Sequence, residues 1–215
     1  MKNSIMLVGG MFMSRAEIKE WSKEKINGNK LELWKGVLLV FLLALAVGFV
    51  TGMFNEETVI GSTIGLIGEL ILAPAQIGLI AFFVNFVKTG EIDRNIIFDY
   101  YSQFWKIVGT ILLMGFIISI GLVFFIIPGI YLAFSYALVP YLLAEKKDLT
   151  IMETLELSRK MMVGHKFDFF ILGLSFIGWA FLIPFTLGIL IIWLLPYVTV
   201  ATAKFCVDII ENYEG

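Results

Sequence analysis

The chain has 215 residues, of which 59% are hydrophobic and 16% charged, with a mean hydropathy of +0.91 and a formal net charge of −2. This composition excludes an ordinary water-soluble domain, because a soluble fold of this size could not bury so much apolar surface. We therefore expect an all-α fold, that of a polytopic helical membrane protein.

Residues 1–13 are expected to form an N-terminal extension, for which disorder is one interpretation. Lys2 and the apolar run from Ile5 to Met13 have the outline of a short signal sequence, but no small-residue cleavage site follows. Translation that starts at Met13 is the alternative. Residues 14–215 are expected to form a single integral membrane domain.

Six apolar segments follow, and we expect about six transmembrane helices. Hydrocarbon cannot satisfy backbone polar groups, so each crossing should be a helix of about 20 mostly apolar residues. The second segment is long enough to tilt or break, and the fourth is short. Proline and glycine at Pro128-Gly129 and Pro184 are expected to turn the chain back. The segments cover residues 36–54, 59–87, 107–127, 130–144, 167–183 and 186–205.

Of the 16 Lys and Arg residues, 15 lie before the first segment or in the second and fourth connections, and Lys204 lies at the end of the sixth segment. The positive-inside rule places such connections in the cytoplasm. Both termini are therefore predicted to be cytoplasmic.

The segments pair into three hairpins, each preceded by a cytoplasmic amphipathic helix. Repeat-like units are expected at about 14–87, 91–144 and 150–207, as parallel repeats about an axis along the membrane normal. The leading helices carry local signals of their ends. These are capping boxes at Ser14 with Glu17 and at Thr150 with Glu153, glycine stops at Gly28 and Gly164, and a cap at Asp93.

Glu69 is the main candidate for an ion- or substrate-binding residue, because a carboxylate inside a membrane span is costly and faces a cavity or a partner. Gln76 lies two helical turns further on, Pro74 frees a carbonyl between them, and Asn85 extends the polar series. A broken helix of this kind is typical of transporters. The alternative is a structural, protonated Glu69 that binds a neighbouring helix.

Arg159, Lys160 and Lys166 are the candidates for contact with anionic lipid or a partner protein, on the amphipathic segment 150–166. The alternative is an interfacial helix that only sets the tilt of the fifth span. No catalytic motif or metal-ligand cluster accompanies them, so we expect no catalytic residues, metal or cofactor. The basic residues are spread along the inner membrane face, so nucleic acid is not an expected partner.

A series of motifs from Pro74 onward resembles a family of uncharacterised bacterial integral membrane proteins, number nine hundred and seventy-five among the domains of unknown function. A more distant likeness is to the membrane domain of some glycerophosphodiester phosphodiesterases. The motifs are PAQIG (74–78), Phe82-Phe83, IIPGI (126–130), SYALVPYLLAE (135–145), SRKMMVGHK (158–166), LSFIGW (174–179), TLGI (186–189) and Pro196-Tyr197.

The resemblance implies a multi-pass protein of the bacterial cytoplasmic membrane and assigns no reaction. We expect a non-catalytic module that interacts with lipids, another membrane protein or a second copy of the chain. Its role would be in envelope homeostasis or in protection from membrane-active peptides. The alternative is a small transporter or channel component for an ion, peptide or lipid that uses Glu69 in a broken second helix.

Overall fold

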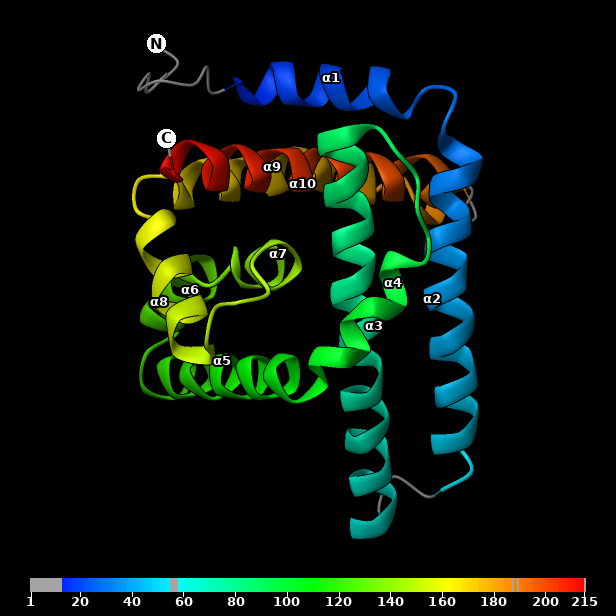
Figure 1. Ribbon diagram of the computed structural model, residues 1–215, viewed down its shortest axis with the longest axis vertical. Helices are drawn as coiled ribbons and strands as arrows, with labels where there is room; N and C mark the ends of the chain where they lie inside the picture. Colours follow the sequence, from blue (N-terminus) through cyan, green and yellow to red (C-terminus); the bar gives the residue numbers. More distant parts are fainter. Residues whose placement is uncertain (1–12, 55–57, 187, 189, 215) are drawn as a thin grey trace.

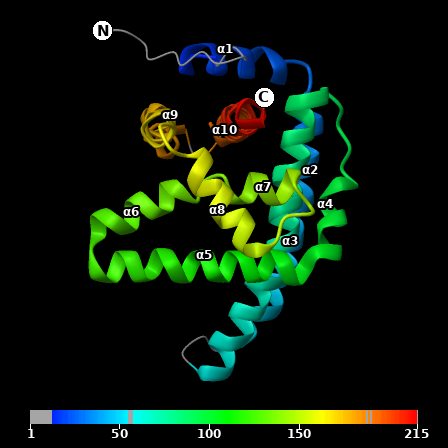
Figure 2. The same cartoon turned by 60° about the vertical axis from the view of Figure 1, so that its left-hand side comes forward.

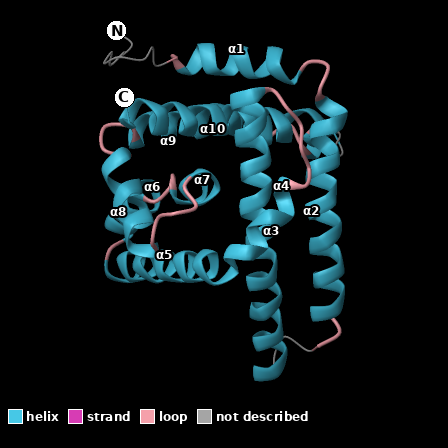
Figure 3. Cartoon of the chain, in the orientation of Figure 1, coloured by secondary structure: helices cyan, strands magenta, loops and turns pink. Residues whose placement is uncertain are grey.

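The computed structural model describes residues 13–54, 58–186, 188 and 190–214, and every regular element in these ranges is helical (Figure 3). The elements are α1 (Arg15–Ile26), α2 (Lys30–Thr51), α3 (Val59–Thr89), α4 (Ile96–Asp99), the 3-10 helix η1 (Tyr100–Gln103), α5 (Phe104–Phe124), α6 (Ile126–Ser135), α7 (Val139–Glu145), α8 (Ile151–Met161), α9 (Lys166–Ala180), the 3-10 helix η2 (Pro184–Thr186) and α10 (Ile191–Glu214). Most of the expected N-terminal extension, residues 1–12, lies outside the described residues.

The helices form three hairpins, as predicted. The first hairpin is α2 with α3, the second is α5 with α6 and α7, and the third is α9 with α10 (Figure 1). Each is preceded by a short helical segment: α1, then α4 with η1, then α8. We call the connection within a hairpin its tip and the opposite end its base.

The local signals at the ends of α1 and α8 are confirmed. Ser14 Oγ accepts the N–H of Glu17 at 3.3 Å, and Thr150 Oγ1 accepts the N–H of Glu153 at 3.3 Å. Both glutamates bond back to the cap backbone, which completes two capping boxes. Gly28 and Gly164 have φ values of +87° and +86°, where a residue with a side chain would be strained.

Five of the described helical stretches are long and apolar enough to cross a membrane. The bent pair of α8 and α9 would be a sixth, with an angle of 83° between the two helices. On its own α9 has 15 residues. A helix of that length spans about 22 Å, which is short of the roughly 30 Å of a hydrocarbon core.

The predicted break in the second span is wrong, because α3 runs unbroken through Pro74 for 31 residues. A proline inside a helix lacks an N–H and leaves carbonyls of the preceding turn without their partner. The hydroxyl of Tyr101, from η1, donates to the carbonyl of Ile71 at 3.1 Å. The carbonyl that loses its helical partner at Pro74 is that of Leu70, four residues earlier. The Tyr101 hydroxyl therefore adds a donor at the next carbonyl along the chain.

The tip of the second hairpin lies at Phe125 and not at Pro128-Gly129. Phe125 is extended, with φ −155° and ψ 126°, and α6 begins at the next residue. The proline falls in the first turn of α6, where its missing N–H costs no helical bond. A second interruption separates α6 from α7, so the fourth apolar segment is two short helices.

The three hairpins point in different directions instead of lying parallel. In Figure 1 α2 and α3 run vertically, whereas α5, α9 and α10 run across the view. Figure 2 shows α9 and α10 nearly end-on while α5 and α6 still run across. The arrangement therefore differs from the expected set of parallel repeats about one axis.

The charged helix α1 lies along the third hairpin from base to tip. Seven of its 12 residues are charged, and such a helix cannot enter hydrocarbon. The third hairpin runs across the direction of α2 (Figure 1), whereas a fifth and a sixth span that crossed the membrane together with α2 would run alongside it. The contacts of α1 are Arg15 Nη1 to Asp168 Oδ1 at 3.3 Å and Lys19 Nζ to Ser175 Oγ at 3.3 Å. Beyond the end of α1, Lys30 at the start of α2 places its Nζ 3.4 Å from the centre of the Trp193 ring.

Burial is concentrated where the bases of the hairpins meet. The second half of α3, α7 and the second half of α10 supply about half of the buried apolar side chains, including Phe82, Leu142 and Ala203 with 0% exposure. Met13, the first described residue, also packs against this core. The tips of the first two hairpins expose large apolar side chains such as Phe49 and Val123.

Candidate functional site

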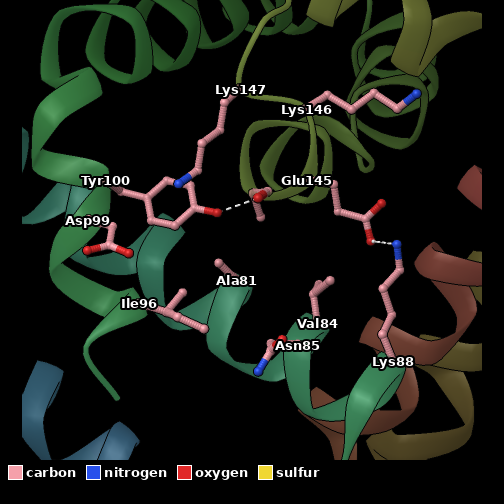
Figure 4. A pocket seen from close by; sticks show the side chains of 11 residues that line it. Ala81, Val84, Asn85, Lys88, Ile96, Asp99, Tyr100, Glu145, Lys146 and Lys147 are labelled. Atoms are coloured by element: carbon pink, nitrogen blue, oxygen red, sulfur yellow. Dashed lines mark hydrogen bonds and ion pairs between the residues drawn. The ribbon is translucent and has the colours of Figure 1, made fainter. Parts of the chain in front are cut away.

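A cavity of about 480 Å³ opens between the C-terminal half of α3, the α4–η1 segment and the end of α7 (Figure 4). We call it the charged cavity, because lysine and carboxylate side chains from three segments converge on it. Its lining residues are Ala81, Val84, Asn85, Lys88, Ile96, Asp99, Tyr100, Ala144, Glu145, Lys146 and Lys147.

An ion pair between Lys88 and Glu145 forms one wall of the charged cavity. Lys88 Nζ lies 2.9 Å from Glu145 Oε1 and 3.5 Å from Glu211 Oε1, so one ammonium joins α3, α7 and α10. The Glu145 side chain is only 10% exposed. Its Oε1 is at ion-pair distance from Lys88 but has no aligned hydrogen-bond donor among the described residues. This carboxylate therefore has capacity for a further donor.

The opposite wall is built on Tyr100. Its ring is buried, and its hydroxyl donates to the carbonyl of Ala144 at the end of α7 (Figure 4). The ammonium of Lys147 lies 4.7 Å from the centre of the same ring. Lys106 Nζ donates to the carbonyl of Lys147 at 2.8 Å. These contacts hold the connection after α7 against the base of α5.

The structure brings one of the three predicted binding residues to this cavity. Asn85 is half-buried, lines the charged cavity, and donates from its side-chain amide to the carbonyl of Glu91 at 3.3 Å. Glu69 and Gln76 share one face of α3, as their spacing predicts, but both are exposed. Neither lines the charged cavity. The structure therefore does not gather the three residues into one site.

The predicted lipid-contacting residues lie where α8 ends and α9 begins. Arg159 and Lys160 are exposed, and Lys160 Nζ pairs with Glu156 Oε1 at 2.7 Å one turn earlier on α8. Lys166 Nζ lies 3.3 Å from the centre of the Tyr131 ring. Their contact with lipid or a partner stays a prediction.

Sequence reasoning missed Lys88 and Glu145 as a pair. Lys88 counted only toward the charge of a connection, and Glu145 only as the last residue of a motif. The available signal was that both lie at the inner ends of spans, with opposite charges.

Within the described ranges no group of three or more His, Cys, Asp or Glu could hold a metal ion. What the arrangement offers chemically is a set of fixed charges that can hold a small charged group.

Together, the three apolar hairpins and the ion-paired residues at their base define a multi-pass helical membrane protein with a charged cavity near one surface. Residues 120–213 match the family model described as "Protein of unknown function (DUF975)", which supports the resemblance predicted from the motifs. The match includes the motifs from IIPGI onward, whereas PAQIG and Phe82-Phe83 lie outside it. No curated protein and no solved structure matches the chain. The likeness to the phosphodiesterase membrane domain stays a prediction.

Proposed function

We propose that the chain is a non-catalytic module of the bacterial cytoplasmic membrane that contacts lipids or another membrane protein. Its role is envelope homeostasis or protection from membrane-active peptides. The observation that carries the proposal is the apolar surface of the hairpin tips. Phe49, Val59, Val123 and Phe124 are each more than 70% exposed there, as is expected of side chains that face lipid tails or a membrane partner.

The transporter alternative has less support. A pathway through the protein needs polar groups that line a continuous cavity. Glu69 and Gln76 lie instead on an exposed face of an unbroken helix. Only Asn85 of the predicted series lines a described cavity.

Survival of bacterial cells under a cationic membrane-active peptide tests the proposal. Cells that express the chain should survive a dose that kills cells carrying an empty vector, and the Glu69→Gln variant should protect equally well. Equal killing of both cell types would contradict the proposed role. Protection that is lost in Glu69→Gln would favour the transporter alternative.

The proposed orientation has both termini in the cytoplasm. It is supported by the basic residues, of which 15 lie before the first span or in the second and fourth connections, while Lys204 ends the sixth span. An alkaline phosphatase fusion after Thr89 should be inactive, because that enzyme needs the oxidising exterior to form its disulfides. An active fusion at this position would contradict the orientation.

A further inference from the structure

A second cavity, of about 420 Å³, lies where the α1–α2 connection meets the tip of the third hairpin. We call it the aromatic cavity. It is separate from the charged cavity and shares no lining residue with it. Its lining residues are Lys23, Ile26, Asn27, Lys30, Trp179, Leu190, Trp193, Leu194 and Tyr197.

The walls of the aromatic cavity are largely apolar and are held in place by a long-range bond. Trp179, Trp193 and Leu194 come from the third hairpin. The indole N–H of Trp34, near the start of α2, donates to the carbonyl of Ile192 at 2.7 Å. This bond fixes the hairpin tip against α2. Tryptophan beside lysine is typical of the membrane interface, where an apolar body and a polar head meet.

The rim of the aromatic cavity is positively charged. None of its described lining residues is acidic. The ammonium of Lys30 lies 3.4 Å from the centre of the Trp193 ring, and that of Lys23 lies 5.9 Å from the centre of the Tyr197 ring. Neither lysine pairs with a carboxylate among the described residues. An aromatic face compensates a cation less completely than an anion does, so both ammonium groups can accept an anionic ligand.

Two further features of the same place favour an anion. The 22-residue helix α2 begins at Lys30, and the side chain of its N-cap residue, Asn29, makes no capping hydrogen bond. The first amides of a helix carry partial positive charge and bind phosphate groups well. In addition, the Tyr197 hydroxyl is buried without a hydrogen-bond partner in the described part of the chain. A ligand with several acceptor oxygens would satisfy such donors.

We propose that the aromatic cavity binds one anionic phospholipid. The phosphate lies between Lys23, Lys30 and the first amides of α2, and an acyl chain lies against Trp179 and Leu194. The charged helix α1 places this cavity at the membrane surface, where a lipid headgroup is at hand and the acyl chain can extend into the bilayer. This inference rests on the proposed role in lipid contact, and it names the lipid and its site.

Native mass spectrometry of the detergent-purified full chain tests the proposal, with phosphatidylglycerol and phosphatidylcholine of the same acyl chains as probes. The wild type should retain one phosphatidylglycerol in preference to phosphatidylcholine. The double variant Lys23→Gln/Lys30→Gln should bind phosphatidylglycerol about 10-fold to 100-fold more weakly, since each lysine near an anionic headgroup contributes about a factor of ten or less. The matched control Lys35→Gln/Arg94→Gln, with the same change in charge at two exposed residues that line neither cavity, should bind as the wild type does.

Equal retention of both lipids, or equal weakening in the two double variants, would overturn the proposal.

Quenching of tryptophan fluorescence in the wild type provides a measurement that does not depend on how the variants fold. Brominated phosphatidylglycerol should quench more than brominated phosphatidylcholine, and equal quenching would also count against the site. Inorganic phosphate at millimolar concentration should not displace the lipid; displacement would assign the site to free phosphate. Because these assays measure lipid binding directly, the proposed protection could fail in cells while the site is confirmed.

Discussion

Gly78 provides the sharpest test of the packing at the charged cavity, because among the described glycines an added Cβ would come closest to a neighbouring backbone there. At Gly78, in the middle of α3, an added Cβ would lie 2.1 Å from the carbonyl oxygen of Ile97 and 2.7 Å from its carbonyl carbon. Ordinary contact between such atoms begins at about 3.3 Å. The Gly78→Ala variant therefore forces α4 away from α3 by about 1 Å, and α4 leads directly into Tyr100.

The size of the effect follows from comparison with a second glycine on the same helix. Gly65 has no neighbouring atom within 4 Å of an added Cβ. Glycine to alanine in a helix gains up to about 1 kcal/mol of stability from backbone propensity at both positions. Overpacking at Gly78 should cost about 1–3 kcal/mol, because the obstructing atoms are backbone and not the end of a flexible side chain. The difference in unfolding free energy between the two variants therefore isolates the contact.

Reversible unfolding in mixed micelles, with sodium dodecyl sulfate as the denaturant and tryptophan fluorescence as the signal, measures this difference. Gly65→Ala should unfold at the same or a higher fraction of sodium dodecyl sulfate than the wild type. Gly78→Ala should unfold at a lower fraction. If the two variants unfold together, the close approach of α3 and α4, and with it the geometry of the charged cavity, is refuted.

Three further outcomes follow from the contacts described. Lys88→Met should lower the unfolding free energy in the same assay by about 1–3 kcal/mol, because it leaves the nearly buried Glu145 without its cation. Glu145→Gln should lower it less. An unfolding free energy that Lys88→Met leaves unchanged would contradict the ion pair. Glu69→Gln should change the unfolding free energy by no more than about 0.5 kcal/mol, since the side chain is exposed, and a large loss would reveal a partner within the protein. Ser14→Ala should cost about 1 kcal/mol through loss of the helix cap. The hydrogen bonds from Ser14 lower the pKa of Glu17 below its usual 4.5. The ionised Glu17 therefore stabilises the folded state fully above the usual pKa, and this stabilisation is lost as the pH falls through the lowered pKa. The protection of the amides in the first turn of α1, expressed relative to the intrinsic exchange rate at each pH, should therefore fall in acid in the wild type, and the fall should be smaller in Ser14→Ala.

The sequence was sufficient for features that depend on neighbouring residues. Capping boxes at Ser14 and Thr150 were predicted because the partner lies three residues away, and the glycine stops because only one residue must adopt a positive φ. The order of hairpins and leading helices followed from the alternation of apolar runs with basic connections. Where two local signals competed the prediction failed: Pro128 was interpreted as a turn, but it is accommodated within the first turn of α6.

Only the tertiary structure decided which distant side chains meet. Lys88 and Glu145 are separated by 57 residues of chain, and nothing in either neighbourhood specifies the other; their contact depends on how α7 lies against α3. In the same way, α1 carries the charges that keep it out of hydrocarbon, but its position along the third hairpin depends on the directions in which the hairpins leave their common base. Lys30 thus meets Trp193, although the predicted topology placed Lys30 before the first span and Trp193 within the sixth. Sequence determined the helices because their hydrogen bonds and caps are local, and the structure decided both cavities because each is made of surfaces that come together only when the hairpins pack.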